Sequence, residues 1–209
     1  MPIGPIVRRA FGPFEHRVTA AYRSIYVDLD DYVDAVREWV PDARRILEVG
    51  CGEGAVTERL AVAYPNAQIT AIDITPRVGR LYRGPTDRVR FRQCAVQDIE
   101  AQEPGSFDLV MIADVIHHVP LELRKGLLDA IKGCLAPGGS LIFKEWERSH
   151  TPIHWMCHAS DRWLTGDRVS FMSRDEGRAF LAQSFDEAAL IDERRVAPWR
   201  NNIMTLVRP

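Results

Sequence analysis

The sequence has no long hydrophobic run, since no stretch of its 209 residues approaches the roughly 20 apolar residues of a membrane span. The first residues contain two prolines and no apolar run of signal-peptide length. Cysteine is scarce too: the four cysteines lie far apart without a C-x-x-C pair, which disfavours a zinc cluster or a disulfide framework. We therefore expect a cytoplasmic protein with no membrane partner.

An excess of one charge is also absent. The chain has 27 basic and 29 acidic residues, and the two signs alternate along its length. We expect no nucleic-acid partner, because general binding to nucleic acid relies on a concentrated basic surface. The composition, 46% hydrophobic and 27% charged, is globular, and the length suits one domain with a sizeable core.

Strands and helices alternate along the chain, which predicts an α/β fold. Apolar or alternating stretches predict strands at 45–50, 68–73, 88–96, 107–114, 140–146, 188–196 and 202–207. Periodicity and capping residues predict helices at 29–40, 55–63, 120–135 and 173–184, with one more starting at Thr75 and Pro76. Together they form a doubly wound, mostly parallel sheet with helices on both faces. The last two strands should pair antiparallel, because their connection is too short for a crossover helix.

A glycine-rich turn follows the first predicted strand, with the sequence Glu48-Val-Gly50-Cys-Gly52-Glu-Gly54. Glycine lets the backbone approach a ligand closely at the end of a strand. With Ala55 the turn also matches a G-x-G-x-x-A dinucleotide site, so an NAD-dependent oxidoreductase is a competing interpretation. Asp73 ends the next strand, where a carboxylate accepts hydrogen bonds from a ribose, and this suits either cofactor.

The ensemble of motifs separates the two interpretations. The stretches ILEVGCGEG, AIDIT, CAVQDIE, FDLVMIADVIHHV and LAPGGSLIF resemble the successive motifs of class I S-adenosylmethionine methyltransferases, over about residues 45–143. The resemblance implies a Rossmann-like fold, S-adenosyl-L-methionine as cofactor and S-adenosylhomocysteine as product. Within the single domain of 1–209, it divides the chain into an N-terminal helical cap (1–44), a cofactor-binding core (45–146), an acceptor-site insertion (147–172) and a last helix with the closing strands (173–209).

The same resemblance assigns roles in cofactor binding. It places Gly50, Cys51 and Gly52 beside the methionine part, Asp73 on the ribose and Asp98 on the adenine amino group. Asp98 has a plain alternative role as the cap of a helix or loop. Glu48 would position the loop or reach the cofactor's ammonium group through water. The remaining expected contacts flank these residues in sequence: Ile74, Val96, Gln97 and Ala113.

Asp114, His117 and His118 follow the fourth strand, at the edge where donor and acceptor must meet. Asp-Val-Ile-His-His resembles the acidic-x-x-acidic-His stretch of ubiquinone-pathway O-methyltransferases, where those side chains can hold a divalent cation such as Mg²⁺. Here His117 replaces the second acid, and nitrogen ligands suit other divalent ions better than Mg²⁺. We take all three residues as catalytic and metal-binding candidates, with helix capping or packing as the alternative role of one histidine.

A second polar group follows the fifth strand: Lys144, Glu145, Trp146, Arg148, His150, His154, Trp155, His158, Arg162 and Trp163. Thr151 and Pro152 predict a helix start, so His154 and His158 would share one helical face. Glu145 and His154 are further catalytic candidates. The segment fits an acceptor pocket or a helix packed on a partner subunit in a homodimer. Residues 11–26 are expected to fold over the cofactor or to serve as a dimerisation arm.

These observations predict an S-adenosylmethionine-dependent methyltransferase, with O-methylation of a small metabolite such as a sugar or a polyketide-like compound. A hydroxyl must lose its proton on attack, and the histidines supply candidate bases. No Asn-Pro-Pro-Tyr motif follows the fourth strand, which disfavours methylation of nucleobase amino groups. A non-catalytic protein that binds S-adenosylmethionine and the NAD-dependent oxidoreductase remain the alternatives.

Overall fold

The computed structural model of the protein describes residues 24–160 and 169–209. Its strands are β1 (Arg45–Val49), β2 (Gln68–Asp73), β3 (Val89–Gln93), β4 (Phe107–Ala113), β5 (Leu135–Trp146), β6 (Leu190–Arg195) and β7 (Asn202–Val207). Its helices are α3 (Leu29–Trp39), α4 (Ala55–Ala63), α5 (Val96–Gln102), α6 (Leu121–Cys134), α7 (Pro152–Ser160) and α8 (Arg174–Leu181), with short 3₁₀ turns at Ile116–His118 and Glu187–Ala189. None of the helices in these two segments has the length and apolar character needed to cross a membrane.

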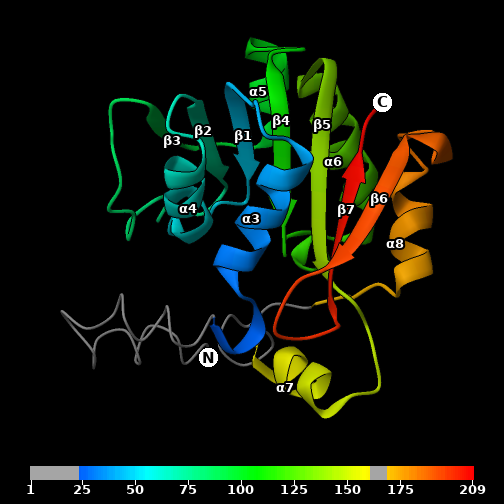
Figure 1. Ribbon diagram of the computed structural model, residues 1–209. Helices are drawn as coiled ribbons and strands as arrows, with labels where there is room; N and C mark the ends of the chain where they lie inside the picture. The colour runs from blue at the N-terminus through cyan, green and yellow to red at the C-terminus, as the bar shows by residue number, and fades with distance from the viewer. Residues whose placement is uncertain (1–23, 161–168) are drawn as a thin grey trace.

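The strands form one sheet in the order β3-β2-β1-β4-β5-β7-β6 (Figure 1). Neighbours from β3 to β5 run parallel, and β7 runs antiparallel between β5 and β6. The doubly wound, mostly parallel sheet with one antiparallel strand is therefore confirmed. The order reverses direction at β1 and β4, which is where ligands bind in open α/β sheets.

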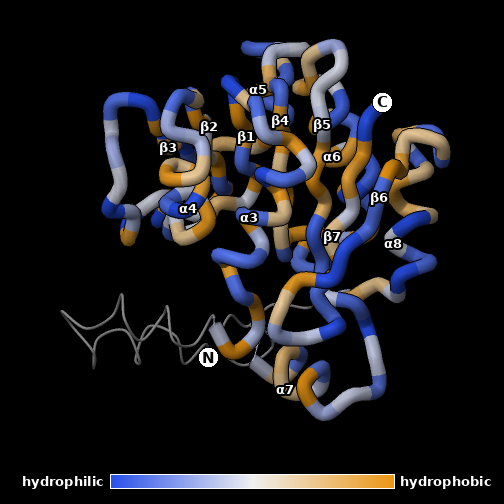
Figure 2. The backbone as a smooth tube through the Cα atoms, viewed as in Figure 1, coloured by the Kyte–Doolittle hydropathy of each residue, from blue (hydrophilic) through white to orange (hydrophobic). Residues whose placement is uncertain are grey.

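Apolar side chains cover both faces of the sheet. On one face, α3 and α4 pack Val33, Val36 and Leu60 against the strands, and the fully buried Ile46 and Leu109 complete that core. The other face carries a second core contributed by α5, α6 and α8: Ile99, Leu128, Ile131, Phe180 and Leu181. Figure 2 shows the hydrophobic colour concentrated along the central strands, whereas α8 and β6 at the edge are largely hydrophilic. Burial on two faces explains why β1 and β4 are continuous apolar runs in sequence.

The prediction of a helix that starts at Thr75 is wrong. Turns occupy residues 76–81, and this segment bonds to the glycine loop: the amide of Gly79 donates to the carbonyl of Gly52, and that of Leu81 to the carbonyl of Glu53. Gly79 has a φ of +64° and lies against the ring of Phe91, where a Cβ would be only 2.4 Å from a ring carbon. The pairing with the loop replaces the hydrogen bonds that a helix would have made.

The third strand is shorter than predicted. It ends at Gln93, and α5 takes up the residues from Val96 onward. Asp98, the third residue of this helix, caps its start, because the Asp98 carboxylate accepts a hydrogen bond from the amide of Ala95 at 3.0 Å. The fifth strand also begins earlier than expected, at Leu135, and the Ala-Pro-Gly-Gly turn lies within its irregular first half.

The C-terminal third follows the sequence closely. Ser173 and Glu176 form the predicted capping box at the start of α8, although the helix ends at Leu181 rather than near residue 184. The predicted helix after Thr151 is α7, in which the rings of His154 and His158 lie 6.5 Å apart. Of the expected N-terminal arm at 11–26, only the last three residues belong to the described part of the chain.

Candidate active site

A cavity of about 490 Å³ opens at the carboxyl ends of β1, β4 and β5. Figure 1 shows α7 beside this edge of the sheet. The cavity is lined by residues from the glycine loop, from the loop after β4, from α3 and from the end of β5, including Tyr26, Tyr32, Glu48, Gly50, Cys51, Gly52, Ala113, Asp114, His117, His118, Lys144, Trp146 and Cys157. Segments far apart in sequence thus surround one space large enough for a cofactor and a small acceptor.

The glycine loop forms one wall of the cavity. Gly50, Gly52 and Gly54 all have positive φ angles, of 78°, 52° and 93°. The amides of Gly50 and Cys51 both donate to the carbonyl of Ile72 in β2. A Cβ on Gly50 would lie 2.2 Å from a methyl carbon of Val115, in the loop after β4. Glycine is required at residue 50 both for its backbone conformation and because the two loops touch there.

Two acids hold this loop in place. The carboxylate of Asp73 accepts hydrogen bonds from the amide of Gly52 at 2.8 Å and from the amide of Thr75 at 2.9 Å. Glu48 is buried and accepts a hydrogen bond from the Thr57 hydroxyl at 2.6 Å. Charge-assisted bonds of this kind orient a loop before a ligand arrives. The ribose contact of Asp73 and the ammonium contact of Glu48 stay predictions.

The other predicted cofactor contacts lie around the same wall. Ala113 lines the cavity at the end of β4, and Cys51 lines it in the glycine loop, where burial raises the pKa of its thiol well above the ordinary value. Ile74 is exposed after β2, Val96 is buried and Gln97 is exposed at the start of α5. Asp98 has the capping role described above, so any contact with an adenine would be made by a carboxylate that already accepts one backbone bond.

His117 lines another wall of the cavity and forms a buried pair with Glu145, which does not line the cavity itself. One oxygen of Glu145 accepts hydrogen bonds from the amides of Val115 and Ile116, at 3.0 and 2.7 Å. The other oxygen lies 2.7 Å from Nδ1 of His117. Burial alone would raise the pKa of Glu145, but the neighbouring His117, the amide of Ile116 and Lys144 outweigh it and hold that pKa below its ordinary value. The carboxylate therefore stays charged and orients the imidazole.

Asp114 and Lys144 form a second pair beside the first. The ammonium of Lys144 lies 2.5 Å from Oδ2 of Asp114, and its side chain is only 1% exposed. Asp114 has a φ of +55°, a conformation that aspartate tolerates better than most residues. Its other oxygen, Oδ1, is buried and makes no hydrogen bond within the described residues. The sequence pattern drew attention to Asp114 and, separately, to Lys144, but it offered no signal that the two side chains would pair.

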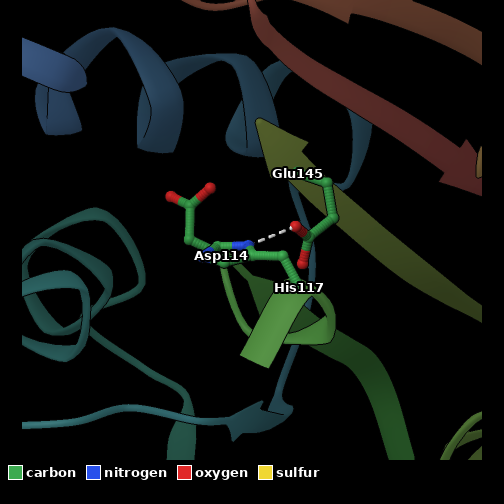
Figure 3. A group of neighbouring side chains, drawn as sticks. All are labelled: Asp114, His117 and Glu145. Carbon is green, nitrogen blue, oxygen red and sulfur yellow. Dashed lines mark hydrogen bonds and ion pairs between the residues drawn. The ribbon is translucent and has the colours of Figure 1, made fainter. Parts of the chain in front are cut away.

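The predicted metal site does not fit this arrangement. The ligand atoms that lie within 4.8 Å of one another belong to Asp114, His117 and Glu145, so Glu145 takes the place expected of His118 (Figure 3). Both oxygens of Glu145 already accept hydrogen bonds or face His117, and Lys144 already neutralises Asp114. A divalent cation would have to displace an ammonium group and disrupt the Glu145–His117 pair. These residues are better partners for one another than ligands for a metal.

The segment after β5 contributes less to the cavity than its composition suggests. Trp146 and Cys157 line the cavity, whereas Trp155 is 63% exposed. His154 is buried and accepts a hydrogen bond at Nδ1 from the indole of Trp146, at 3.1 Å. It thereby fixes a cavity wall from behind. One cavity residue had no such signal in sequence: Tyr32, whose place on the apolar stripe of α3 predicts a core side chain.

Comparison with known proteins matches the central part of the chain to a described family. Residues 46–139 match a family described as "Methyltransferase domain". This match spans the glycine loop, Asp73, Asp98 and the loop after β4, and it ends before Lys144 and Glu145.

Curated relatives point to the same chemistry. A protein named ubiquinone biosynthesis O-methyltransferase, from Xanthomonas campestris pv. campestris (strain B100), is 40% identical over 123 residues, which are 57% of this chain and 49% of that protein. The chain spans about half the length of the curated relatives it matches.

Solved structures share the fold at low sequence identity. The pyocyanin biosynthetic protein PhzM has a TM-score of 0.71 at 15% identity, over 94% of this chain and 58% of that one. A Burkholderia thailandensis 1,6-didemethyltoxoflavin-N1-methyltransferase, solved with 1,6-didemethyltoxoflavin and S-adenosylhomocysteine, has a TM-score of 0.66 at 17% identity, over 98% and 87%. Neighbours with the same fold thus include an N-methyltransferase, so the fold does not decide the acceptor atom.

Proposed function

Because its core is a class I S-adenosylmethionine-dependent methyltransferase domain, we propose that the protein methylates a hydroxyl group of a small metabolite. The observation that carries this proposal is the buried Glu145–His117 pair, whose imidazole lines the cavity. A hydroxyl must lose its proton as its oxygen attacks the methyl carbon, and an oriented imidazole is the usual group to accept it.

The glycine loop fits the proposed cofactor. Its positive-φ glycines bring backbone close to the cavity, and Asp73 and Glu48 stand at the ends of two adjacent strands. S-adenosylmethionine, when bound, supplies an electrophilic methyl group on a sulfonium. The protein's task is then to align the acceptor and to take up its proton, and alignment alone can supply much of the acceleration.

His117 is the residue we assign as base. With the proton of Nδ1 directed at the Glu145 carboxylate, Nε2 is the nitrogen of the neutral imidazole that carries the basic lone pair. Glu145 stabilises the imidazolium that forms and holds the ring in one orientation, as a positioning residue. His118 lies against His117, with ring centroids 4.2 Å apart, and lines the same cavity. We assign it to acceptor contact.

The acceptor class is supported by the size and chemistry of the cavity. A volume of about 490 Å³ suits a cofactor tail and a small molecule such as a sugar or a polyketide-like compound, and aromatic rings of Tyr26, Tyr32 and Trp146 supply flat apolar walls. We propose a cytoplasmic enzyme without a nucleic-acid partner, consistent with four free cysteines and a formal net charge of -2. Homodimer formation through α7 stays a prediction.

The experiment that tests this function has two stages. Calorimetric titration with S-adenosylhomocysteine and with NADH establishes which cofactor binds, and we expect binding of the first alone. Labelled S-adenosylmethionine is then incubated with the protein and hydroxylated acceptors or amines, and products that gain one methyl group are identified by mass spectrometry. We expect O-methyl products. Binding of S-adenosylhomocysteine without any transfer would favour a non-catalytic binding protein, and N-methyl products would overturn the choice of hydroxyl.

A further inference from the structure

The pair formed by Lys144 and Asp114 is not used by the mechanism above. Lys144 is fully buried at the end of β5, and burying an ammonium group costs several kcal/mol unless its partner and its hydrogen bonds compensate. A residue placed only for stability at this point of the sheet could be apolar, as its neighbours Ile142 and Phe143 are. The cost points to a functional role for the charge.

The hydrogen-bonding capacity of the pair is only partly used. An ammonium group has three N–H donors, and within the described residues the side chain of Lys144 donates only to Asp114 Oδ2. Oδ1 of Asp114 is buried and accepts nothing from those residues. Both side chains line the cavity. The pair therefore offers the cavity two donors from one cation and one acceptor atom beside them.

The groups around Lys144 define the charge that an acceptor meets. The loop after β4 contributes Asp114, the 3₁₀ turn contributes His117, and Glu145 of β5 pairs with that histidine. From α3 comes the phenol of Tyr32, whose pKa burial raises, with further contributions from Glu48 and Asp114. Asp114 and Glu145 are each already paired, with Lys144 and His117. The ammonium is thus a cation of the cavity held at a fixed position.

We propose that Lys144 is a substrate-contacting catalytic residue, whose ammonium donates a hydrogen bond to the acceptor hydroxyl oxygen and stabilises its negative charge without a metal ion. This rests on the proposed function. The acceptor O–H bond breaks and its proton passes to His117 Nε2; the oxygen uses an electron pair to form the new O–CH₃ bond; the bond between the methyl carbon and sulfur breaks and leaves its electrons on sulfur. Asp114 keeps Lys144 in place. The acceptor class that follows is an acidic hydroxyl, phenolic or enolic, whose anion an ammonium can stabilise.

The test follows the ionisation of a bound probe, so that it does not depend on turnover. 4-Nitrophenol changes its absorption when it ionises, and it is titrated between pH 5 and 9 with the protein saturated in S-adenosylhomocysteine. A cation within about 4–6 Å favours the anion and lowers a pKa by about 1–3 units. We expect wild-type protein to lower the probe's pKa by about 1 unit or more relative to Lys144→Met.

Matched variants separate this role from a structural one. Lys125→Met, at an exposed lysine of α6, should behave as wild type. Asp114→Asn should lower the probe's pKa further, because the ammonium then has no competing carboxylate, and this variant also keeps the test open if Lys144→Met does not fold. Equal probe pKa values in wild type, Lys144→Met and Asp114→Asn, or no binding of the probe to wild type, would overturn the proposal.

Turnover provides an independent arm. With substituted phenols of rising acidity, Lys144→Met should lose most rate on the least acidic phenols, at unchanged affinity for S-adenosylhomocysteine, whereas EDTA should leave wild-type rates unchanged. Loss of turnover in EDTA with recovery in Mg²⁺ or Mn²⁺ would overturn the proposal. If the protein shifted the probe's pKa but transferred no methyl group to any hydroxyl, the proposed function would be contradicted. The proposed cationic site at Lys144 would then still be supported.

Discussion

The two walls of the cavity are built on different principles. The cofactor wall, formed by the glycine loop and Asp73, consists mainly of backbone amides that side-chain carboxylates hold in place, such as the Gly52 amide on the Asp73 carboxylate. The acceptor wall, formed by the ends of β4 and β5, consists of buried charged side chains whose partners are about 30 residues apart, such as Lys144 with Asp114. A common cofactor needs a constant backbone, whereas each acceptor needs its own side chains.

The two walls touch where Val115 packs on Gly50, and Gly50→Ala should have the largest effect because it breaks both. The new Cβ of alanine would lie 2.2 Å from a methyl carbon of Val115, and the backbone at this residue has a positive φ. We therefore expect the variant to lose about 2–5 kcal/mol of folding stability and to lose cofactor binding. Thermal unfolding and calorimetric titration with S-adenosylhomocysteine measure both. Gly138→Ala is the control: it has a φ of +75° and open space for a Cβ, so only strain applies. Equal losses in the two variants would contradict the contact argument.

Glu145→Gln should affect the acceptor wall alone. The amide can still accept from the backbone of Val115 and Ile116, but it no longer stabilises a protonated His117. We expect kcat to fall by about 10²- to 10⁴-fold, with little change in affinity for S-adenosylhomocysteine. Glu147→Gln is the matched control, because Glu147 lies just after the end of β5 and pairs with Arg195. A variant with wild-type kcat would remove His117 and Glu145 from the mechanism.

Asp73→Ala should affect the cofactor wall alone. Losing charge-assisted bonds of about 1.5–3 kcal/mol should weaken binding of S-adenosylhomocysteine by about 10- to 100-fold. Asp108→Ala supplies a close control, since the Asp108 carboxylate accepts from the amides of Arg44 and Arg45, both at 2.9 Å, at the opposite end of the sheet. Both variants should lose similar stability, and only Asp73→Ala should lose affinity. Unchanged affinity in folded Asp73→Ala would contradict the predicted ribose contact.

His154→Gln should have the smallest effect, on the support behind the acceptor wall. Burial, and then the nearby His158, Arg148 and His150, lower the pKa of His154 from its ordinary 6.5. The unfolded chain therefore binds a proton more readily, and the stability from this group, present above pH 6.5, is lost as pH falls through the lower folded-state pKa. Melting temperatures at pH 7.5 and 5.5 should differ less in His154→Gln than in wild type. His150→Gln removes an exposed histidine that contributes least among these groups to the pKa of His154, so its two melting temperatures should differ nearly as much as those of wild type. A larger difference in His154→Gln than in wild type would reverse our assignment.

Local sequence signals predicted most elements correctly. The strand at 68–73, the helix at 55–63 and the capping box at Ser173 are confirmed because periodicity and caps act within a few residues. The helix after Thr75 failed although its caps were good, because Gly79 pairs with the glycine loop across the sheet edge. Tertiary contacts outweighed the intrinsic helix propensity of this segment, and such contacts cannot be predicted from a short stretch of sequence.

Sequence likewise located some residues of the candidate site and missed others. The glycine loop, Asp73 and the Asp114-His117-His118 stretch could be located from sequence, because the motif order brings them to one edge of a parallel sheet. His154 and Trp155 looked like acceptor contacts, but α7 turns Trp155 to solvent and places His154 behind Trp146. Tyr32 fits the apolar stripe of a helix, and only the tertiary structure reveals that it lines the cavity.

By itself, the sequence determined that this chain folds as a doubly wound sheet with a glycine loop and an acid at the end of its second strand, since strand periodicity and glycine conformations are local properties. Only the tertiary structure decided which charges meet. β4 and β5 lie side by side in parallel register, with Ala113 opposite Lys144, and this places Lys144 on Asp114 and Glu145 on His117. Pairing across a sheet depends on register between distant segments, and register is set by the packing of the whole core.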